Sequence, residues 1–237
     1  MALDSPAIEA NIARVRAEIA DAARQAGRNP AEITLVAVSK TFPADSVRAA
    51  HTAGLHHFGE NRVQETESKR PPLADLPATW HLIGHLQSNK VRRAVELFDR
   101  IDSVDSIALA KKINDAAAEH GKRLGILIEV HMGEATKTGV AESDLPDLAR
   151  AATSLSHLDL LGLMTVPPYS DDPELARPYF QKLRALRDEI TRQIGRPLPV
   201  LSMGMSHDFE IAIQEGATEI RVGTAIFGQR SSPARVL

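Results

Sequence analysis

Residues 33–40 read ITLVAVSK, a short apolar run rich in β-branched side chains that ends on a lysine. Similar runs recur along the chain, and segments with helical spacing separate them. We expect strands at residues 33–40, 56–60, 79–84, 100–104, 125–132, 158–166, 198–203 and 219–227. We expect helices near residues 44–53, 61–69, 87–98, 106–120, 142–156, 174–194 and 207–215.

This alternation implies a parallel sheet, because parallel strands must be joined by crossover connections. A closed barrel and an open doubly wound sheet both fit the pattern. Eight predicted strands and 237 residues favour the α/β class with a single (β/α)8 TIM-type barrel, for which roughly 250 residues are typical. No linker-like segment or shift in composition interrupts the chain, so we expect one domain over residues 1–237.

A further helix is expected before the first strand, outside the barrel. Ser5 can cap it, and Pro6 suits its first position because the missing N–H would be unsatisfied there anyway. Gly27 ends the run. The apolar residues with helical spacing are Ile8, Ile12, Val15, Ile19 and Ala23.

Composition excludes several classes of protein. Hydrophobic residues make up 43% of the chain and charged residues 25%, which argues against disorder. The formal charge of −3 argues against a general nucleic-acid binder. Cysteine is absent, so disulfides and thiolate chemistry are excluded. The first residues do not form a secretory signal and no apolar stretch approaches the ~20 residues of a membrane span, so we expect a cytoplasmic protein.

In barrels of this type the active site lies at the carboxyl ends of the strands. Reading those ends gives a set of candidate residues that depends on no motif. They are Ser39 and Lys40, residues 59–61, Gly84 and His85, Ser103, His131, Met164 and Thr165, residues 202–204, and residues 221–224.

Two features of these strand ends predict a ligand. Lys40 has an amine that can condense with a carbonyl group. After the last two predicted strands, Ser206 can cap the following helix, and Gly223 and Thr224 offer a close backbone approach and a hydroxyl, as anion sites require. If the first and last strands are neighbours, the chain can hold a phosphorylated carbonyl compound as a Schiff base on Lys40.

Arg221 has three interpretations at this stage. It is a second phosphate ligand, a structural ion-pair partner, or a residue beside the ring nitrogen of a pyridine cofactor. In the last case arginine leaves the nitrogen unprotonated, and the ring is then a weak electron sink.

The histidines do not predict a metal site. His81 and His85 are four residues apart, but in an extended run they lie about 13 Å from each other. His56 and His57 point to opposite faces of a strand. No carboxylate stands near them at ligand spacing, so we expect satisfied polar or surface histidines and no metal.

Seven collinear motifs resemble one family, the YggS/PROSC-type pyridoxal phosphate homeostasis proteins. They are LVAVSK at 35–40, FGENRVQE at 58–65, WHLIGHLQSNK at 80–90, GEATKTG at 133–139, GLMT at 162–165, LSMGMS at 201–206 and IRVGTAIFG at 220–228. The resemblance runs from about residue 8 to residue 230. His131 departs from it, since a polar residue such as asparagine is expected there, and this puts one contact at the rim of the site in doubt.

The resemblance implies a barrel like the N-terminal domain of alanine racemase, with pyridoxal 5′-phosphate (PLP) on a lysine. Lys40 matches the Schiff-base lysine, and Arg221 matches the partner of the pyridine nitrogen. The other matching cofactor-binding residues are Ser206, Gly223 and Thr224 at the phosphate, and Asn61, Met164 and Ser202 near the cofactor.

From this resemblance we expect a PLP carrier or buffer in vitamin B6 homeostasis, without robust catalysis and with no catalytic residue. Similar racemases take a second base from a tyrosine on a C-terminal domain, and this sequence stops at Leu237, shortly after its last strand. Expected partners are PLP and apo PLP-dependent enzymes, with a monomeric chain and neither nucleic acid nor membrane. The alternatives are a PLP-dependent racemase-like enzyme, a lysine-dependent aldolase that acts on a sugar phosphate, and a purely structural barrel.

Overall fold

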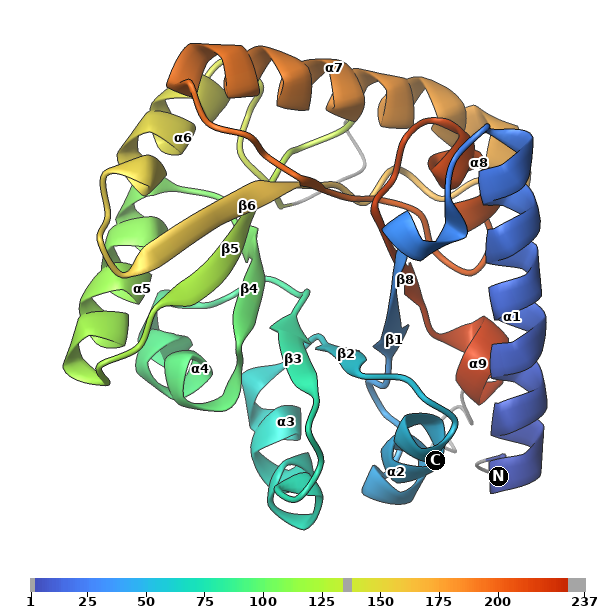
Figure 1. The fold of residues 1–237 in the computed structure, drawn as a ribbon. Coiled ribbons are helices and arrows are strands. Elements are labelled where there is room, and N and C mark those ends of the chain that lie inside the picture. Colours follow the sequence, from blue (N-terminus) through green and yellow to red (C-terminus); the bar gives the residue numbers. More distant parts are fainter. Residues whose placement is uncertain (1–2, 134–137, 230–237) are drawn as a thin grey trace, which may run out of the picture.

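The computed structural model describes residues 3–133 and 138–229, which form a closed barrel of eight parallel strands ringed by helices (Figure 1). The predicted (β/α)8 fold is therefore confirmed. The strands are β1 Thr34–Val38, β2 His57–Glu60, β3 Thr79–Leu82, β4 Arg100–Val104, β5 Leu124–Glu129, β6 Leu158–Met164, β7 Val200–Ser202 and β8 Glu219–Val222.

Helices surround the strands on the outside of the barrel (Figure 1). They are α1 Ser5–Gln25, α2 Ala44–Thr52, α3 Val63–Lys69, α4 Val91–Leu97, α5 Ile107–Glu119, α6 Leu145–Thr153, α7 Arg177–Ile194, α8 Phe209–Gln214 and α9 Thr224–Phe227. Those from α2 to α8 connect one strand to the next. Short 3-10 turns lie at η1 Pro30–Glu32, η2 Pro71–Leu73, η3 Ser88–Lys90 and η4 Pro173–Ala176. None of the helices in the described part of the chain combines the length and the apolar character that a membrane span requires.

The first and last strands pair with each other, as the candidate ligand site requires. In the parallel β1–β8 ladder, Thr34 lies opposite Glu219 and Ala37 opposite Val222. The turn that follows β1 and the turn that follows β8 therefore leave the barrel side by side, at its carboxyl-terminal mouth.

The predicted additional helix is present as α1, which packs along α8, α9 and α2 on one side of the barrel (Figure 1). Its apolar stripe is buried, with Ile8, Ile12 and Val15 each at most 1% exposed. The prediction that Ser5 caps this helix is wrong. Asp4 is the N-cap, and its carboxylate accepts the Ala7 amide at 3.0 Å, while Ser5 is already helical.

Several predicted elements are longer than the observed ones, and one has the wrong type at its end. The last strand was expected to run to residue 227, but β8 ends at Val222 and α9 occupies Thr224–Phe227. An apolar strand and an apolar buried helix are hard to distinguish by composition over so few residues. The helix predicted at 174–194 starts as the 3-10 turn η4 and continues as α7, with Phe180, Leu183, Leu186 and Ile190 buried as expected.

Candidate functional site

A cavity of about 460 Å³ opens at the carboxyl-terminal mouth of the barrel. It receives residues from the turns after β1, β2, β3, β6, β7 and β8. Six of the eight predicted site residues line it, namely Lys40, Asn61, Ser206, Arg221, Gly223 and Thr224. The other two, Met164 and Ser202, are fully buried and do not line it.

Lys40 follows β1 and lines the same cavity as the turn after β8. At Gly223 the two chain segments approach so closely that a Cβ atom on this glycine would lie 3.1 Å from the carbonyl oxygen of Val38. Glycine therefore allows the backbone after β8 to form one wall of the cavity beside the lysine.

Ser206 and the turn at Gly223 are directly connected. The Ser206 hydroxyl accepts the backbone N–H groups of Gly223 and Ala225, each at 3.3 Å. The prediction that Ser206 caps the following helix is therefore wrong, because its oxygen faces the turn after β8 instead. The position before α8 is occupied by Asp208, whose carboxylate accepts the Met205 amide at 2.6 Å.

This arrangement leaves a set of donors that suits an anion. The Ser206 oxygen already accepts two bonds, and its own O–H has no acceptor among the described residues. The same holds, within residues 3–133 and 138–229, for the backbone amides of Ser206 and Thr224 and for the Thr224 hydroxyl. These groups belong to residues that line one cavity, and a phosphate group can accept hydrogen bonds from all of them.

Arg221 reaches the same cavity from below. Its side chain is buried, and its guanidinium donates to the Ser202 hydroxyl at 2.7 Å and to the Thr165 carbonyl oxygen at 2.8 Å. Ser202 thus contributes to the cavity by holding the Arg221 guanidinium in place. Burial lowers the pKa of Arg221, and the carboxylates of Glu219, Asp102 and Glu129 oppose this shift.

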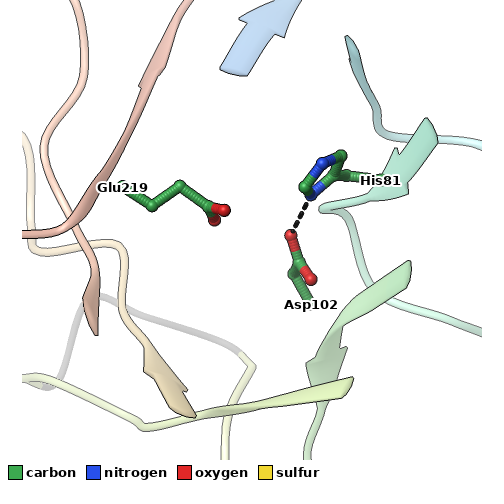
Figure 2. A group of neighbouring side chains, drawn as sticks. All are labelled: His81, Asp102 and Glu219. Carbon is green, nitrogen blue, oxygen red and sulfur yellow. Dashed lines mark hydrogen bonds and ion pairs between the residues drawn. The ribbon is translucent and has the colours of Figure 1, made fainter. Parts of the chain in front are cut away.

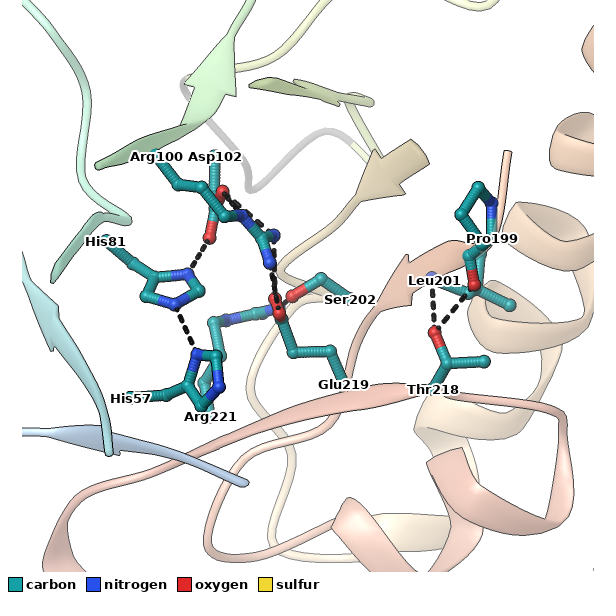
Figure 3. Close-up of polar contacts among 10 residues, drawn as sticks. All are labelled: His57, His81, Arg100, Asp102, Pro199, Leu201, Ser202, Thr218, Glu219 and Arg221. Carbon is teal, nitrogen blue, oxygen red and sulfur yellow. Dashed lines mark hydrogen bonds and ion pairs between the residues drawn. The ribbon is translucent and has the colours of Figure 1, made fainter. Parts of the chain in front are cut away.

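A polar network fills the barrel interior beneath Arg221 (Figure 3). Nε2 of His81 lies 3.0 Å from Nδ1 of His57, and Nδ1 of His81 lies 2.9 Å from Asp102. Arg100 then joins Asp102, at 3.1 Å, to Glu219, at 2.8 Å. The side chains come from β2, β3, β4 and β8, whereas the alternate residues Phe58, Trp80 and Ile101 are buried under the helices.

The two histidines and Asp102 form one continuous chain of hydrogen bonds. Asp102 accepts from Nδ1–H of His81, and Nε2 of His81 is bonded to Nδ1 of His57. Burial and the neighbouring His81 lower the pKa of His57. The lowered pKa favours the neutral form of His57 near pH 7.

His81, Asp102 and Glu219 bring ligand atoms within 4.8 Å of one another, which is a possible geometry for a metal ion (Figure 2). The prediction from sequence did not find this group, because its members lie on three strands far apart in the chain. The charges argue against a cation here. Arg100 already pairs with both carboxylates and Arg221 lies close above, so an added cation would be repelled.

Sequence reasoning also missed much of the cavity rim. Tyr169, in the segment after β6, lines the cavity with 78% of its surface exposed, and its ring lies 5.8 Å from that of His207. Met205 and His207 could have been found, because they flank Ser206 at the end of the LSMGMS motif. Nothing in the sequence pattern marks Tyr169. In the GEATKTG motif, residues 134–137 lie outside the described residues.

Fold and cavity together define a (β/α)8 barrel with a ligand site at the carboxyl ends of its strands. The family model described as "Alanine racemase, N-terminal domain" matches residues 3–231. A pyridoxal phosphate homeostasis protein of Aquifex aeolicus is 46% identical over 92% of this chain and 96% of its own length. One of Pseudomonas aeruginosa is also 46% identical, over 94% of this chain and 96% of its own.

A solved structure carries the same fold. PipY of Synechococcus elongatus, crystallised with PLP bound, is 39% identical and superimposes with a TM-score of 0.83 over 93% of this chain and 100% of its own. This chain belongs to the alanine racemase N-terminal domain family and, within it, to the pyridoxal phosphate homeostasis (YggS/PROSC) proteins. The resemblance found in the sequence motifs is therefore confirmed.

Proposed function

We propose that this chain binds PLP in the mouth cavity, with the aldehyde carbon joined to Lys40, and that it serves as a PLP carrier or buffer. The observation that carries the proposal is the placement of Lys40 and of the donors at Ser206 and Thr224 on one cavity of about 460 Å³. PLP carries its aldehyde and its phosphate arm on neighbouring carbons of the ring, so it matches a cavity in which an amine and a set of anion donors lie close together.

The covalent step is a simple exchange. The neutral amine of Lys40 adds to the aldehyde carbon, a C=N bond replaces the C=O bond, and one water molecule leaves. The reaction needs no oxidant or further reactant and is reversible in water. Reversibility is the property that a carrier requires.

Arg221 supports a role without robust turnover. In the proposed pose its guanidinium, held by Ser202 and the Thr165 carbonyl, faces the pyridine nitrogen. A cation there disfavours protonation of the nitrogen, and the ring then stabilises a substrate carbanion poorly.

Tyr169 is a poor candidate for the second base that racemisation requires. Its hydroxyl donates to Asp171 at 3.1 Å, and this neighbour raises the pKa of Tyr169 above its usual value. A phenol of raised pKa is protonated at neutral pH and does not abstract a proton efficiently. Tyr169 therefore gives no support to the racemase-like alternative.

The first experiment tests the lysine. PLP is added to the purified protein, the visible absorbance band of the Schiff base is recorded, and the adduct is reduced with borohydride and mapped by mass spectrometry. We expect the label on Lys40, and we expect Lys40→Ala to lose the band while it keeps the wild-type melting temperature. Lys182→Ala is the matched control, because Lys182 is half exposed and pairs with Glu142 at the surface. A band that survives in Lys40→Ala would contradict the proposal.

The second experiment separates the carrier from an enzyme. The loaded protein is mixed with an apo PLP-dependent enzyme, the proposed partner, and the appearance of the partner's activity is followed. Amino acids are added in parallel, and α-proton exchange is measured in heavy water. Turnover at about 1 s⁻¹ or faster would overturn the carrier role.

A further inference from the structure

The turn that carries Lys40 has an unusual backbone. Thr41, the next residue, has a φ of +69° and is the only non-glycine residue with positive φ among those described. This left-handed conformation is unfavourable for a β-branched side chain. Such a conformation persists only when surrounding contacts hold it, and it is concentrated at functional sites.

Helix α3 supplies one of these contacts. Glu65, in the first turn of α3, accepts the backbone N–H of Thr41 with its carboxylate. The residue on the C-terminal side of Lys40 is therefore tied to a charged acceptor 24 positions away in sequence. Hydrogen bonds to charged groups are about twice as strong as those between neutral groups.

Lys69, at the end of α3, holds the other side of the turn. Its ammonium donates to the Ser39 carbonyl oxygen at 2.8 Å, to Glu60 at 2.6 Å and to Glu65 at 3.3 Å. The Ser39 hydroxyl also donates to Glu60, at 2.6 Å. Both neighbours of Lys40 are thus fixed by one group of three side chains, Glu60, Glu65 and Lys69, here called the α3 clamp.

Two of the three members of the α3 clamp are buried, whereas the side chain of Glu65 is 26% exposed. The side chain of Lys69 is 6% exposed and that of Glu60 is 0% exposed. Burial raises the pKa of Glu60, and the Lys69 ammonium and the Ser39 hydroxyl oppose this rise. A buried ion pair is weak evidence for a stabilising role, because desolvation offsets much of its attraction. The Glu60–Lys69 pair is better explained by positioning, because the clamp holds the residues on both sides of Lys40.

We propose that the α3 clamp is a positioning device that holds the strained turn at Thr41 and so aims the Lys40 amine at the aldehyde of PLP. The inference rests on the proposed function and extends it to residues that do not line the cavity. Bond formation requires the amine and the aldehyde carbon to be held in register, and a displacement of about 1 Å is enough to impair such a step. The phosphate donors at Ser206 and Thr224 follow other strands, β7 and β8, and form no hydrogen bond with the clamp among the described residues.

The test compares two ligands on several variants. PLP reports on the covalent bond, whereas pyridoxine 5′-phosphate has the same ring and phosphate with an alcohol in place of the aldehyde. For Glu65→Ala we expect PLP to bind about tenfold more weakly, while the affinity for pyridoxine 5′-phosphate stays within about twofold. Glu65→Gln, which keeps a carbonyl acceptor for the Thr41 amide, should recover part of the loss.

The controls use the same helix and the same turn. Glu67→Ala should change neither affinity, because Glu67 pairs with Arg93 at the surface. Thr41→Gly removes the backbone strain, so Glu65→Ala should cost less in that background than in the wild type. Lys69→Met removes the hydrogen bond to the Ser39 carbonyl oxygen and should weaken PLP binding in the same way as Glu65→Ala. If this variant does not fold, the double variant Glu60→Gln, Lys69→Met removes both buried charges and tests the same contact to Ser39.

A readout without cofactor completes the experiment. In the PLP-free protein, the Thr41 amide should exchange with solvent faster in Glu65→Ala than in Glu67→Ala. Equal losses of affinity for both ligands, or an unchanged affinity for PLP, would overturn the positioning role. A wild-type adduct mapped to a lysine other than Lys40 would instead refute the proposed function, and the positioning role with it.

Discussion

Arg221→Met should be among the most destabilising single substitutions in the barrel. Arg221 is 3% exposed, and its replacement removes two short hydrogen bonds and leaves the Thr165 carbonyl and the Ser202 hydroxyl buried without their donor. It also removes a cation that offsets the buried carboxylates of Glu129 and Glu219. Removing one member of a buried charged group costs about 3–5 kcal/mol.

Urea unfolding at neutral pH, followed by circular dichroism, measures this cost as a shift in midpoint at constant slope. The matched control is Arg92→Met, which breaks an exposed pair with Glu119 and should cost less than about 1 kcal/mol. A loss below about 1 kcal/mol for Arg221→Met as well would refute the view that Arg221 neutralises the barrel interior.

The pH dependence gives the same prediction a second check. Burial raises the pKa of Glu129, and Arg221 opposes this rise. In the unfolded chain the pKa of Glu129 is near 4.5. Above that pH, folding must bury a carboxylate that is charged in the unfolded chain, so the free energy of unfolding falls as pH rises. Without Arg221 the pKa rises further, and the deficit of Arg221→Met should therefore be larger at about pH 8 than at about pH 5. A deficit independent of pH would show that Glu129 does not sense Arg221.

Three further predictions concern the cavity and the interior. Thr224→Ala should weaken PLP retention by about 1.5–3 kcal/mol in an equilibrium titration, because a hydrogen bond to a charged group is lost, and unchanged affinity would remove Thr224 from the phosphate site. Gly223→Ala should lower the free energy of unfolding by about 1–3 kcal/mol, since its methyl group would crowd the Val38 carbonyl oxygen, and a wild-type urea midpoint would contradict this. The pKa of His57 is lowered from 6.5, so the unfolded chain binds more protons below that pH and stability falls as pH falls through this region. His57→Gln should reduce this acid-induced loss, and melting temperatures at several pH values for both proteins decide it.

The barrel and the composition of its mouth could be read from the sequence because both depend on local patterns. Alternating strand and helix signals predicted parallel pairing, and the ends of the predicted strands named Lys40, Asn61, Arg221, Gly223 and Thr224 before any coordinates. Ring closure then required the first and last strands to meet, as the β1–β8 ladder shows. Element ends were less accurate, since caps such as Asp4 depend on one hydrogen bond.

The contacts that give these residues their chemistry were decided by tertiary structure. Nothing in the sequence pattern joins Ser206 to the amide of Gly223, Glu65 to the amide of Thr41, or His81 to Asp102. These bonds connect residues on different strands and helices, and packing determines which polar groups are buried together and must satisfy each other. The order of apolar and polar residues along the chain thus determined the barrel and the side of it that carries the site. Only the folded chain determined how the lysine is held and what neutralises the arginine beneath it, because buried charge and hydrogen-bond geometry are properties of neighbours in space.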